Sequence, residues 1–321
     1  MNYSDALTIL LPLWGRDGYT KKILDYMSKI DVPFKIVIAD GKGEDKSHWI
    51  NTESFPKLRL EYKHYGLDDD INKFMRKMYL ASSSITTPLT VMVDNDDLFD
   101  LDGFIAGVKF LADNDDFASF RENIVEHHTG NPIYRAESIT LDSSDKRITQ
   151  LFDFGTTQGG INSAWHDICR THILKKMFKI MFQSGNQDFQ LSHSANKYWS
   201  LFYGKSYKEN NIPYISHVAG QSLVQGTGLY SKYINWVNDV NFKDSMAVII
   251  SSVKGLLKDC DEETIKKIQE VIILDPYRLG RHNTPDQNEI DDLLQLSQKY
   301  DTMVVDILNQ KDTTPSCFTL E

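Results

Sequence analysis

Residues 88–97 read Pro88-Leu-Thr-Val-Met-Val-Asp-Asn-Asp-Asp97, an apolar run that ends directly in clustered acids. The run is rich in β-branched side chains, which favours a buried strand. The carboxylates of Asp94, Asp96 and Asp97 would repel one another at the end of that strand unless a cation compensates them. Oxygen-only clusters of this kind suit hard cations such as Mg²⁺ or Mn²⁺. By itself, the same pattern also fits an acidic turn that caps the next helix.

The residues before this stretch alternate between strand and helix patterns. Continuous apolar runs at 7–13 and 34–39 are typical of strands buried on both faces. Helical spacing of apolar residues follows at 19–30 and 68–83, and an alternating pattern predicts another strand at 58–65. This order predicts an α/β fold with a mixed, mostly parallel sheet flanked by helices.

Ligands of such sheets bind outside the carboxyl ends of the strands. Asp40 ends the second predicted strand, and the acids at 94–97 end the fourth, so we expect them at one edge of the sheet. The glycine-rich signatures of P-loop and dinucleotide-binding proteins are absent from the sequence. The pattern therefore predicts a ligand at this edge without indicating either of those nucleotide-binding types.

Four features, in order, resemble a GT-A glycosyltransferase, and most closely the family 2 type. The first strand runs into Pro12-Leu-Trp-Gly-Arg16, and the second ends in Asp40-Gly41. The helix that carries Asn72 and Arg76 stands where the family has a basic residue, and Asp94-Asn-Asp-Asp97 matches its D-x-D-D motif. The resemblance covers about the first hundred residues and implies a nucleotide-sugar donor.

The resemblance also implies roles for individual residues. The implied donor-binding residues are Pro12, Asp40, Arg76, Asp94 and Asp97. In this scheme Asp94 holds the ribose, Asp40 accepts a hydrogen bond from the base, and Asp96 binds a divalent metal, Mn²⁺ or Mg²⁺. The metal neutralises the diphosphate leaving group as a Lewis acid. A solvated charge on the surface of a helix explains Arg76 equally well.

Two positions depart from the family pattern. Ala39 stands where the family usually has the first acid of its second strand, and the helix reads Met75-Arg-Lys where Ala-Arg-Asn is usual. The resemblance therefore leaves the identity of the nucleotide open.

Two residues of the second hundred complete the implied site. Asp188, in Gln187-Asp188, stands where the family has the general base that deprotonates the acceptor hydroxyl, which implies inversion at the anomeric carbon. Alternatively, Asp188 is an acid at the start of a helix, where the positive end of the helix dipole favours negative charge. His217 follows a strand expected at 212–217 and stands where the family completes its metal or diphosphate site. A lone histidine is also commonly structural.

The rest of the chain is predicted from periodicity. We expect helices at 101–113 and 165–182, short strands at 117–120 and 133–135, and an antiparallel excursion at 138–151. C-terminal helices are expected at 246–257, 262–273, 284–298 and 301–308, the third beginning at a capping box, Thr284-Pro-Asp-Gln287. We divide the chain into a GT-A catalytic domain at 1–235, with a nucleotide-binding half at 1–100 and an acceptor half at 101–235, and a helical extension at 236–321.

Composition limits the partners and the compartment. The chain has 321 residues and a net charge of -10, which argues against a nucleic-acid partner. Cys169, Cys260 and Cys317 are too far apart to suggest a disulfide framework or a zinc site, and they favour a reducing compartment. With no membrane span or signal peptide in the pattern, we expect a cytoplasmic protein. Attachment to the inner face of the membrane and self-association through the C-terminal helices both stay open.

The sequence thus predicts a metal-dependent, inverting glycosyltransferase of the hexosyltransferase type. It would move a sugar from a nucleotide-sugar to a glycan or lipid-linked acceptor in surface polysaccharide biosynthesis. The first alternative is a catalytically degenerate GT-A module that binds sugar or assembles a complex. The second is a D-x-D phosphohydrolase, a class whose motif belongs at the end of the first strand rather than the fourth.

Overall fold

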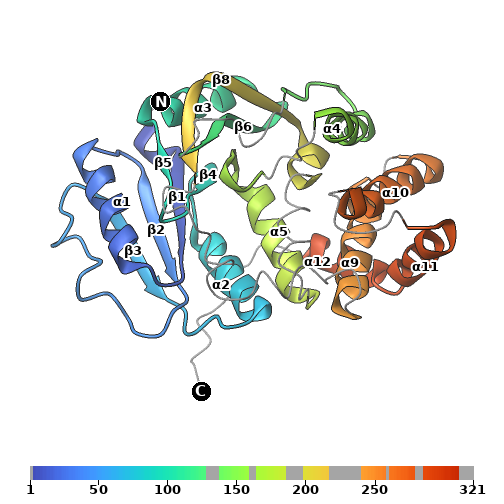
Figure 1. Ribbon diagram of the computed structural model, residues 1–321, viewed down its shortest axis with the longest axis horizontal. Helices are drawn as coiled ribbons and strands as arrows, with labels where there is room; N and C mark the ends of the chain where they lie inside the picture. Colours follow the sequence, from blue (N-terminus) through green and yellow to red (C-terminus); the bar gives the residue numbers. More distant parts are fainter. Residues whose placement is uncertain are drawn as a thin grey trace.

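The computed structural model describes residues 3–127, 137–158, 164–185, 198–216, 240–257, 260–278 and 285–310. These residues form one mixed sheet with helices on its faces, and further helices gather beside α5 and α4 (Figure 1). The sheet has the strand order β3-β2-β1-β4-β7-β6-β8-β5. This arrangement confirms the predicted α/β class with C-terminal helices.

The bounds of the elements are as follows. The strands are β1 (Leu7–Leu13), β2 (Lys35–Asp40), β3 (Arg59–His64), β4 (Leu89–Met92), β5 (Leu98–Phe99), β6 (Phe117–Glu126), β7 (Ile168–Arg170) and β8 (Lys205–Ser216). The helices are α1 (Asp17–Lys29), α2 (Ile71–Ser84), α3 (Leu101–Asp113), α4 (Ser144–Gln158), α5 (Thr171–Gln183), α9 (Val240–Leu256), α10 (Glu262–Arg278), α11 (Gln287–Gln298) and α12 (Asp301–Asn309). Two short 3-10 turns are η1 (Tyr3–Asp5) and η2 (Ala164–His166).

The first four strands form a parallel half-sheet with β1 in its centre. β1 pairs with β2 on one side and with β4 on the other, and β2 pairs with β3. The register places Leu13 beside Asp40, and Val93 donates its backbone N–H to the carbonyl of Leu10. The continuous apolar runs are buried as expected for strands covered on both faces. Asp40 and the acids after β4 therefore lie at the same edge.

Beyond β4 the sheet becomes mixed. β7 runs antiparallel to both β4 and β6, β6 runs parallel to β8, and β5 runs antiparallel to β8. The helix predicted at 165–182 is confirmed from Thr171, where α5 begins, but the prediction was wrong for the residues before it, which include η2 and β7. β7 is only three residues long and pairs through Thr90 and Cys169, so tertiary pairing, rather than periodicity, decides its conformation.

The antiparallel excursion predicted at 138–151 was also wrong. In this stretch Ile139 makes an isolated bridge to Ser206, and α4 begins at Ser144. Ile148 and Leu151 are buried at a helical spacing of three residues. The strand predicted at 133–135 lies outside the described residues.

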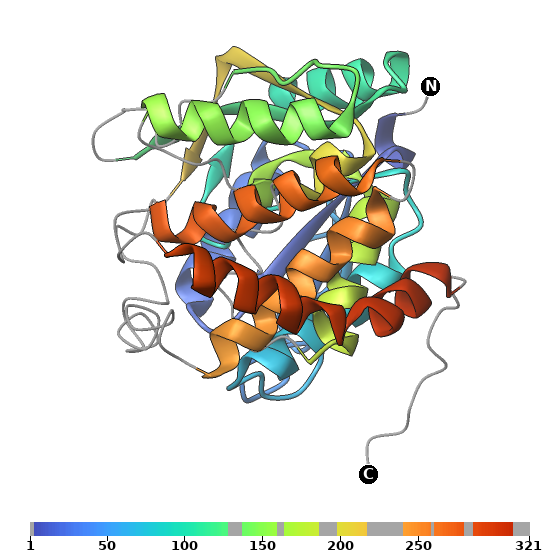
Figure 2. The ribbon, with the colours of Figure 1, turned by 90° about the vertical axis from the view of Figure 1, so that its right-hand side faces the viewer.

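The C-terminal helices share a hydrophobic core with α2 and α5. α9 packs against α10, α11 and α12, while α10 contacts α4 and α12 contacts α5 (Figure 2). α11 is capped by Asp286, whose side chain accepts from the N–H of Glu289 at 2.9 Å, so the cap is not the one predicted at Thr284. The division of the chain near residue 235 stays a prediction.

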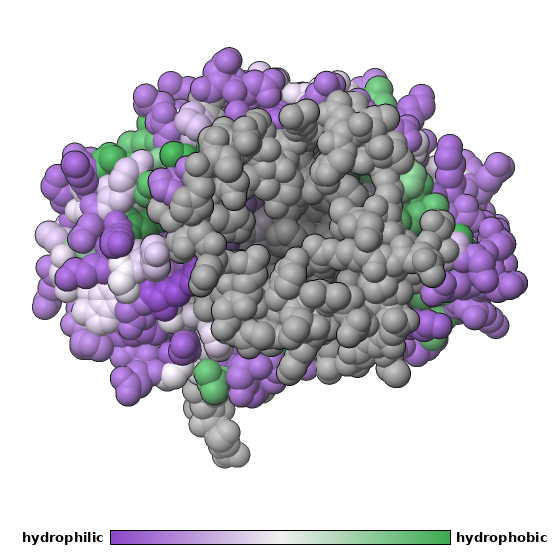
Figure 3. Space-filling model, viewed as in Figure 1, coloured by the Kyte–Doolittle hydropathy of each residue, from purple (hydrophilic) through white to green (hydrophobic). Residues whose placement is uncertain are grey.

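On the face shown in Figure 3, hydrophilic residues dominate the described surface around the parallel half-sheet. None of the helices in the described residues combines the length and the apolar character that crossing a membrane requires.

Glu122 occupies an irregular position on β6. The register between β6 and β8 shifts between Arg121 and Asn123, and the side chain between them is only 4% exposed. Neither carboxyl oxygen has a hydrogen-bond partner among the described residues. Burial, with a smaller contribution from the charge of Asp100, raises the pKa of Glu122 well above its usual value. At pH values between the pKa of the unfolded chain and that of the folded protein, Glu122 is therefore expected to be protonated in the folded state and ionised in the unfolded state.

Substituting Glu122 by Gln is expected to flatten the dependence of stability on pH. A raised carboxyl pKa means that the folded state holds a proton that the unfolded state releases, so wild-type stability falls as pH rises above the unfolded value. Between pH 5 and pH 8 the variant is expected to lose less stability than the wild type, because its side chain does not ionise. Urea denaturation at both values measures this difference. Parallel curves for the two proteins would contradict the assignment.

Candidate functional site

The turn after β4 gives its polar side chains different partners. The side-chain amide of Asn95 donates to the carbonyl of Gly15 at 3.2 Å and to Thr20 Oγ1 at 3.0 Å. Asp96 accepts a hydrogen bond from Arg16 Nη1 at 2.7 Å, in a pair whose side chains are 7% and 16% exposed. The loops that follow β1 and β4 are therefore joined by an amide contact and by a shielded ion pair.

Arg16 adopts a left-handed backbone conformation directly before α1. Its φ and ψ are 57° and 46°, and Gly15 before it has a φ of 80°. A residue with a Cβ is uncommon in this region and persists where neighbouring contacts hold it. The ion pair with Asp96 is such a contact, so the start of α1 is coupled to the acidic turn.

Asp94 and Asp97 lie instead beside His166. One potential metal-binding atom from each of these three side chains lies within 4.8 Å of the others. His166 belongs to η2, which precedes β7, and the antiparallel pairing of β7 with β4 carries η2 alongside the end of β4. Tyr214 of β8 donates a hydrogen bond to Asp97 Oδ2 at 2.8 Å. We call Asp94, Asp97 and His166 the Asp-Asp-His group.

The electrostatics of this group favour a bound cation. Burial raises the pKa of Asp94 to about 6, and the negative charge of Asp97 adds to the effect. The indole N–H of Trp165 donates to Asp94 Oδ1 at 3.3 Å, and this hydrogen bond lowers the pKa of Asp94. A divalent cation would offset the mutual repulsion of two shielded carboxylates.

Asp40 lies at the same edge as the Asp-Asp-His group, but its carboxylate is engaged within the protein. It is fully buried and accepts from Lys46 Nζ at 2.6 Å, from the hydroxyl of Tyr62 at 3.0 Å and from the backbone N–H of Lys42 at 3.1 Å. These contacts shape the loop after β2. Lys42 in that loop lies with its ammonium 4.6 Å from the centre of the Trp14 ring.

A second buried ion pair lies close to Asp40. Lys77 of α2 contacts Asp68 at 2.5 Å and donates to the carbonyl of Leu13 at 3.1 Å. Its side chain is 1% exposed and that of Asp68 is 3% exposed. A Cβ on Gly41 would lie 2.1 Å from Asp68 Oδ2, which explains why a glycine follows Asp40. The pair therefore occupies the space directly behind the end of β2.

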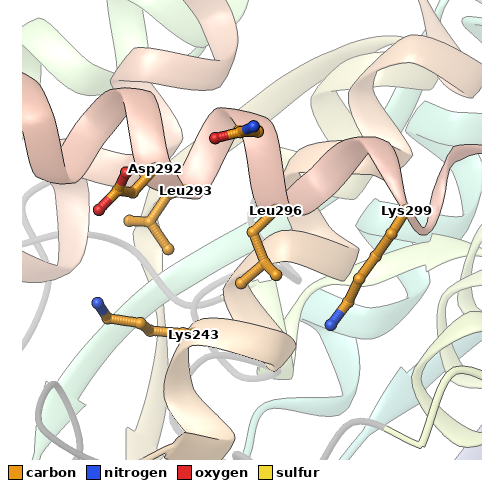
Figure 4. Close-up of a pocket in the computed structure, with 6 residues that line it drawn as sticks. Lys243, Asp292, Leu293, Leu296 and Lys299 are labelled. Atoms are coloured by element: carbon orange, nitrogen blue, oxygen red, sulfur yellow. The ribbon is translucent and has the colours of Figure 1, made fainter.

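A cavity of about 390 Å³ lies elsewhere, between α9 and α11. Its lining residues are Lys243, Asp292, Leu293, Gln295, Leu296 and Lys299 (Figure 4). Lys299 is paired with Asp244 at 2.8 Å. The cavity brings together no group of acids and histidines like that at the end of β4, so we place the candidate site at the edge of the sheet.

No family model and no curated protein sequence matches the chain. Among solved structures, S. aureus TarS 1–349 is 14% identical and aligns over 94% of this chain and 83% of its own, with a TM-score of 0.63. The same TarS fragment in complex with UDP-GlcNAc aligns over 94% and 84%, with 14% identity and a TM-score of 0.58. A longer TarS structure, 14% identical with a TM-score of 0.59, aligns over 85% of this chain and 43% of its own length. The chain therefore spans less than half of that longer structure.

Alignment over nearly the whole chain establishes a shared fold despite the low identity. The chain has a GT-A-like glycosyltransferase fold. The resemblance stated from four motifs is thereby confirmed at the level of the fold. In this fold the turn after β4, with Asp94 to Asp97, lies at the carboxyl edge of the parallel half-sheet, as predicted.

The structure brings together some predicted site residues and separates others. Asp94 and Asp97 lie together, whereas Asp96, the predicted metal ligand, faces Arg16. Pro12 is half-buried in β1, opposite Ala39. Arg76, on α2, is also half-buried. Asp188 and His217 lie outside the described residues. The roles assigned to all of these residues stay predictions.

Sequence reasoning missed two residues that the GT-A-like fold brings to this edge. His166 lies in no metal-binding spacing, and only the pairing of β7 with β4 reveals it. Lys77, rather than the adjacent Arg76, is the cation of α2 that reaches the end of β1. Neighbouring helix residues point about 100° apart, so Lys77 and Arg76 face different surroundings although they are adjacent in sequence.

Proposed function

We propose that this chain transfers a sugar from a nucleotide-sugar donor to a hydroxyl of a glycan or lipid-linked acceptor. The observation that carries the proposal is the Asp-Asp-His group at the carboxyl edge of a GT-A-like sheet. The presence of UDP-GlcNAc in a TarS structure of the same fold supports a nucleotide-sugar as ligand. We further propose the hexosyltransferase type, a role in surface polysaccharide biosynthesis and a cytoplasmic location.

The donor set of the group fits a divalent cation. Two carboxylates favour Mg²⁺ or Mn²⁺, and an imidazole shifts the preference from Mg²⁺ toward Mn²⁺. Asp94, Asp97 and His166 would hold the ion, which would neutralise the charge that develops on the diphosphate as it leaves. Arg16 is held at the same turn by its ion pair with Asp96.

The proposed reaction inverts the anomeric carbon. The oxygen of the acceptor hydroxyl forms a bond to that carbon, while the bond from the carbon to the diphosphate breaks and its electron pair leaves with the diphosphate. Asp188 is the residue that we propose takes the hydroxyl proton as general base. The resemblance to the family motif Glu-Asp supports that role, although Asp188 lies outside the described residues.

A screen of nucleotide-sugars by thermal shift, with and without Mn²⁺, tests the proposal. A ligand at 100 times its dissociation constant stabilises the folded state by about 2.7 kcal/mol. UDP-GlcNAc is the first candidate, and UMP is the control because it lacks the diphosphate. We expect the melting temperature to rise by about 4 °C with one nucleotide-sugar, only when Mn²⁺ is present.

The outcome also separates the enzyme from the degenerate module. Release of a nucleoside diphosphate from the donor that shifts the melting temperature would support catalysis. Binding without any turnover in the presence of glycan or lipid-linked acceptors would favour the sugar-binding module. No shift with any nucleotide-sugar would refute the proposed donor site.

A further inference from the structure

The acids after β4 belong to one tight turn. The backbone N–H of Asp97 donates to the carbonyl of Asp94 at 3.2 Å, which closes a four-residue turn. The two corner residues, Asp94 and Asp97, have their carboxylates in the Asp-Asp-His group. The two central residues, Asn95 and Asp96, instead contact the loop after β1 and the first turn of α1. The rotation of this turn therefore determines which of its side chains reach the group.

Asn95 joins the turn to the neighbouring loop by two hydrogen bonds. Its amide nitrogen has two hydrogens, and the acceptors are the carbonyl of Gly15 at 3.2 Å and Thr20 Oγ1 at 3.0 Å. The Thr20 hydroxyl donates in turn to the carbonyl of Arg16 at 3.4 Å. Thr20 is fully buried and Asn95 is 6% exposed. These bonds are therefore shielded from water, which would otherwise compete for the same groups.

The ion pair of Arg16 with Asp96 is not an independent support of the turn. Gly15 and Arg16 both have left-handed backbones, with φ of 80° and 57°. Asn95 holds the carbonyl of the peptide unit that joins these two residues, so it helps to set the direction in which the Arg16 side chain leaves the loop. The long side chain of Arg16 has many rotamers and can follow a rotation of the turn. The short side chain of Asn95 cannot, so it is the more rigid contact.

We propose that Asn95 is a positioning residue: it holds the turn after β4 in the rotation that places Asp94 and Asp97 at the cation site and directs Asp96 away from it. Groups that orient metal ligands from outside the site commonly contribute to metal affinity. This inference rests on the metal site of the proposed function. It gives a role to Asn95, the uncharged residue of the D-x-D-D motif.

The first test needs no metal. The indole N–H of Trp165 donates to Asp94 Oδ1 at 3.3 Å, so its NMR signal reports the position of that carboxylate. Spectra that correlate ¹H with ¹⁵N resolve the indole signals, and a Trp165→Phe variant assigns this one. We expect the Trp165 signal to move in Asn95→Ala, because the freed turn carries Asp94 away from the indole. An unchanged signal would overturn the proposal.

Asn114→Ala is the matched control. The side-chain amide of Asn114 donates to the carbonyl of Phe110 at 2.8 Å, at the C-terminal end of α3. The substitution removes a bond of the same kind without touching the turn, so the Trp165 signal is expected to stay in place. A displacement as large as that in Asn95→Ala would mean a general response to lost stability, and it would overturn the positioning role.

The second test measures Mn²⁺ binding without nucleotide, by electron paramagnetic resonance of the free ion. We expect affinity to fall by about 10–100-fold in Asn95→Ala, as is typical when a group that orients a ligand is lost, and to stay unchanged in Asn114→Ala. A loss no larger than that in Asp96→Asn would overturn the proposal, since the ion pair would then hold the turn as well as Asn95 does.

The two tests separate this inference from the proposed function. If the wild type bound no Mn²⁺, the metal site would fail, and the Trp165 signal would still decide whether Asn95 fixes the turn. If Asn95→Ala did not fold, Thr20→Val would take its place, because it removes one of the two acceptors and keeps Asn95. We expect a smaller displacement of the Trp165 signal in that variant, and an unchanged signal would overturn the proposal.

Discussion

Replacing Lys77 by Met is expected to destabilise the protein by about 3–5 kcal/mol at pH 7. The substitution keeps the length of the side chain but leaves the buried carboxylate of Asp68 without its cation. Burial already raises the pKa of Asp68 to about 6, although Lys77 acts to lower it. Without Lys77, Asp68 must either stay ionised in an apolar interior or take up a proton.

The pH dependence of this variant identifies the cause. Removing the cation raises the folded pKa of Asp68 further above its unfolded value. The variant is therefore more stable at pH 5, where the carboxyl is protonated in the folded state, than at pH 7 or 8. Its stability falls as pH rises through 6 and above. Urea denaturation at pH 5, 7 and 8 measures the loss.

Two further variants serve as controls. Arg76→Met changes the neighbouring cation on α2, which is half-buried, and is expected to alter stability by about 0.5 kcal/mol or less. The double variant Asp68→Asn with Lys77→Met removes both charges and should recover part of the lost stability. A loss under about 1 kcal/mol in Lys77→Met, or a loss that does not depend on pH, would contradict the role assigned to this pair.

Replacing Asp97 by Asn is expected to lower Mn²⁺-dependent transfer by about 10²–10³-fold, equivalent to about 3–4 kcal/mol of barrier. The amide keeps the volume and can still accept from Tyr214, so the main change is the lost negative charge at the Asp-Asp-His group. Mn²⁺ affinity should fall in parallel. Isothermal titration with Mn²⁺ and the rate of nucleoside diphosphate release measure the two effects.

Asp96→Asn is the informative comparison, since the sequence predicts Asp96 as the metal ligand. In the structure its carboxylate is paired with Arg16. We expect this variant to weaken Mn²⁺ binding by less than about 10-fold, because a positioning group typically contributes less than a ligand. If Asp96→Asn lost Mn²⁺ as completely as Asp97→Asn, the Asp-Asp-His group would be the wrong set of ligands.

The parallel half of the fold could be predicted because its signals are local. The strands at 7–13 and 34–39 are continuous apolar runs, and their order with the helices determines a parallel sheet. The acids after β4 were placed correctly because the end of a strand is a property of the sequence alone. The individual partners of these acids were not predicted, because they come from distant parts of the sequence. Arg16, which pairs with Asp96, lies 80 positions before it.

The antiparallel half could not be predicted in the same way. β7 has three residues, and its conformation depends on pairing with β4. His166 is brought to the site only through that pairing, so its spacing in the sequence contains no indication of a metal site. The contact of Lys77 with the carbonyl of Leu13 was not predicted for a related reason, since it depends on which face of α2 packs against β1.

The shared core of α2, α5 and the C-terminal helices has a consequence for biosynthesis. The ribosome makes the chain from its N-terminus, so residues 240–310 emerge after the whole sheet. Until then, the side of α5 that α12 covers remains open to water. Exposed apolar surface of this kind promotes aggregation of incomplete chains. The sheet that carries the candidate site is therefore made before the helices that cover this side of α5.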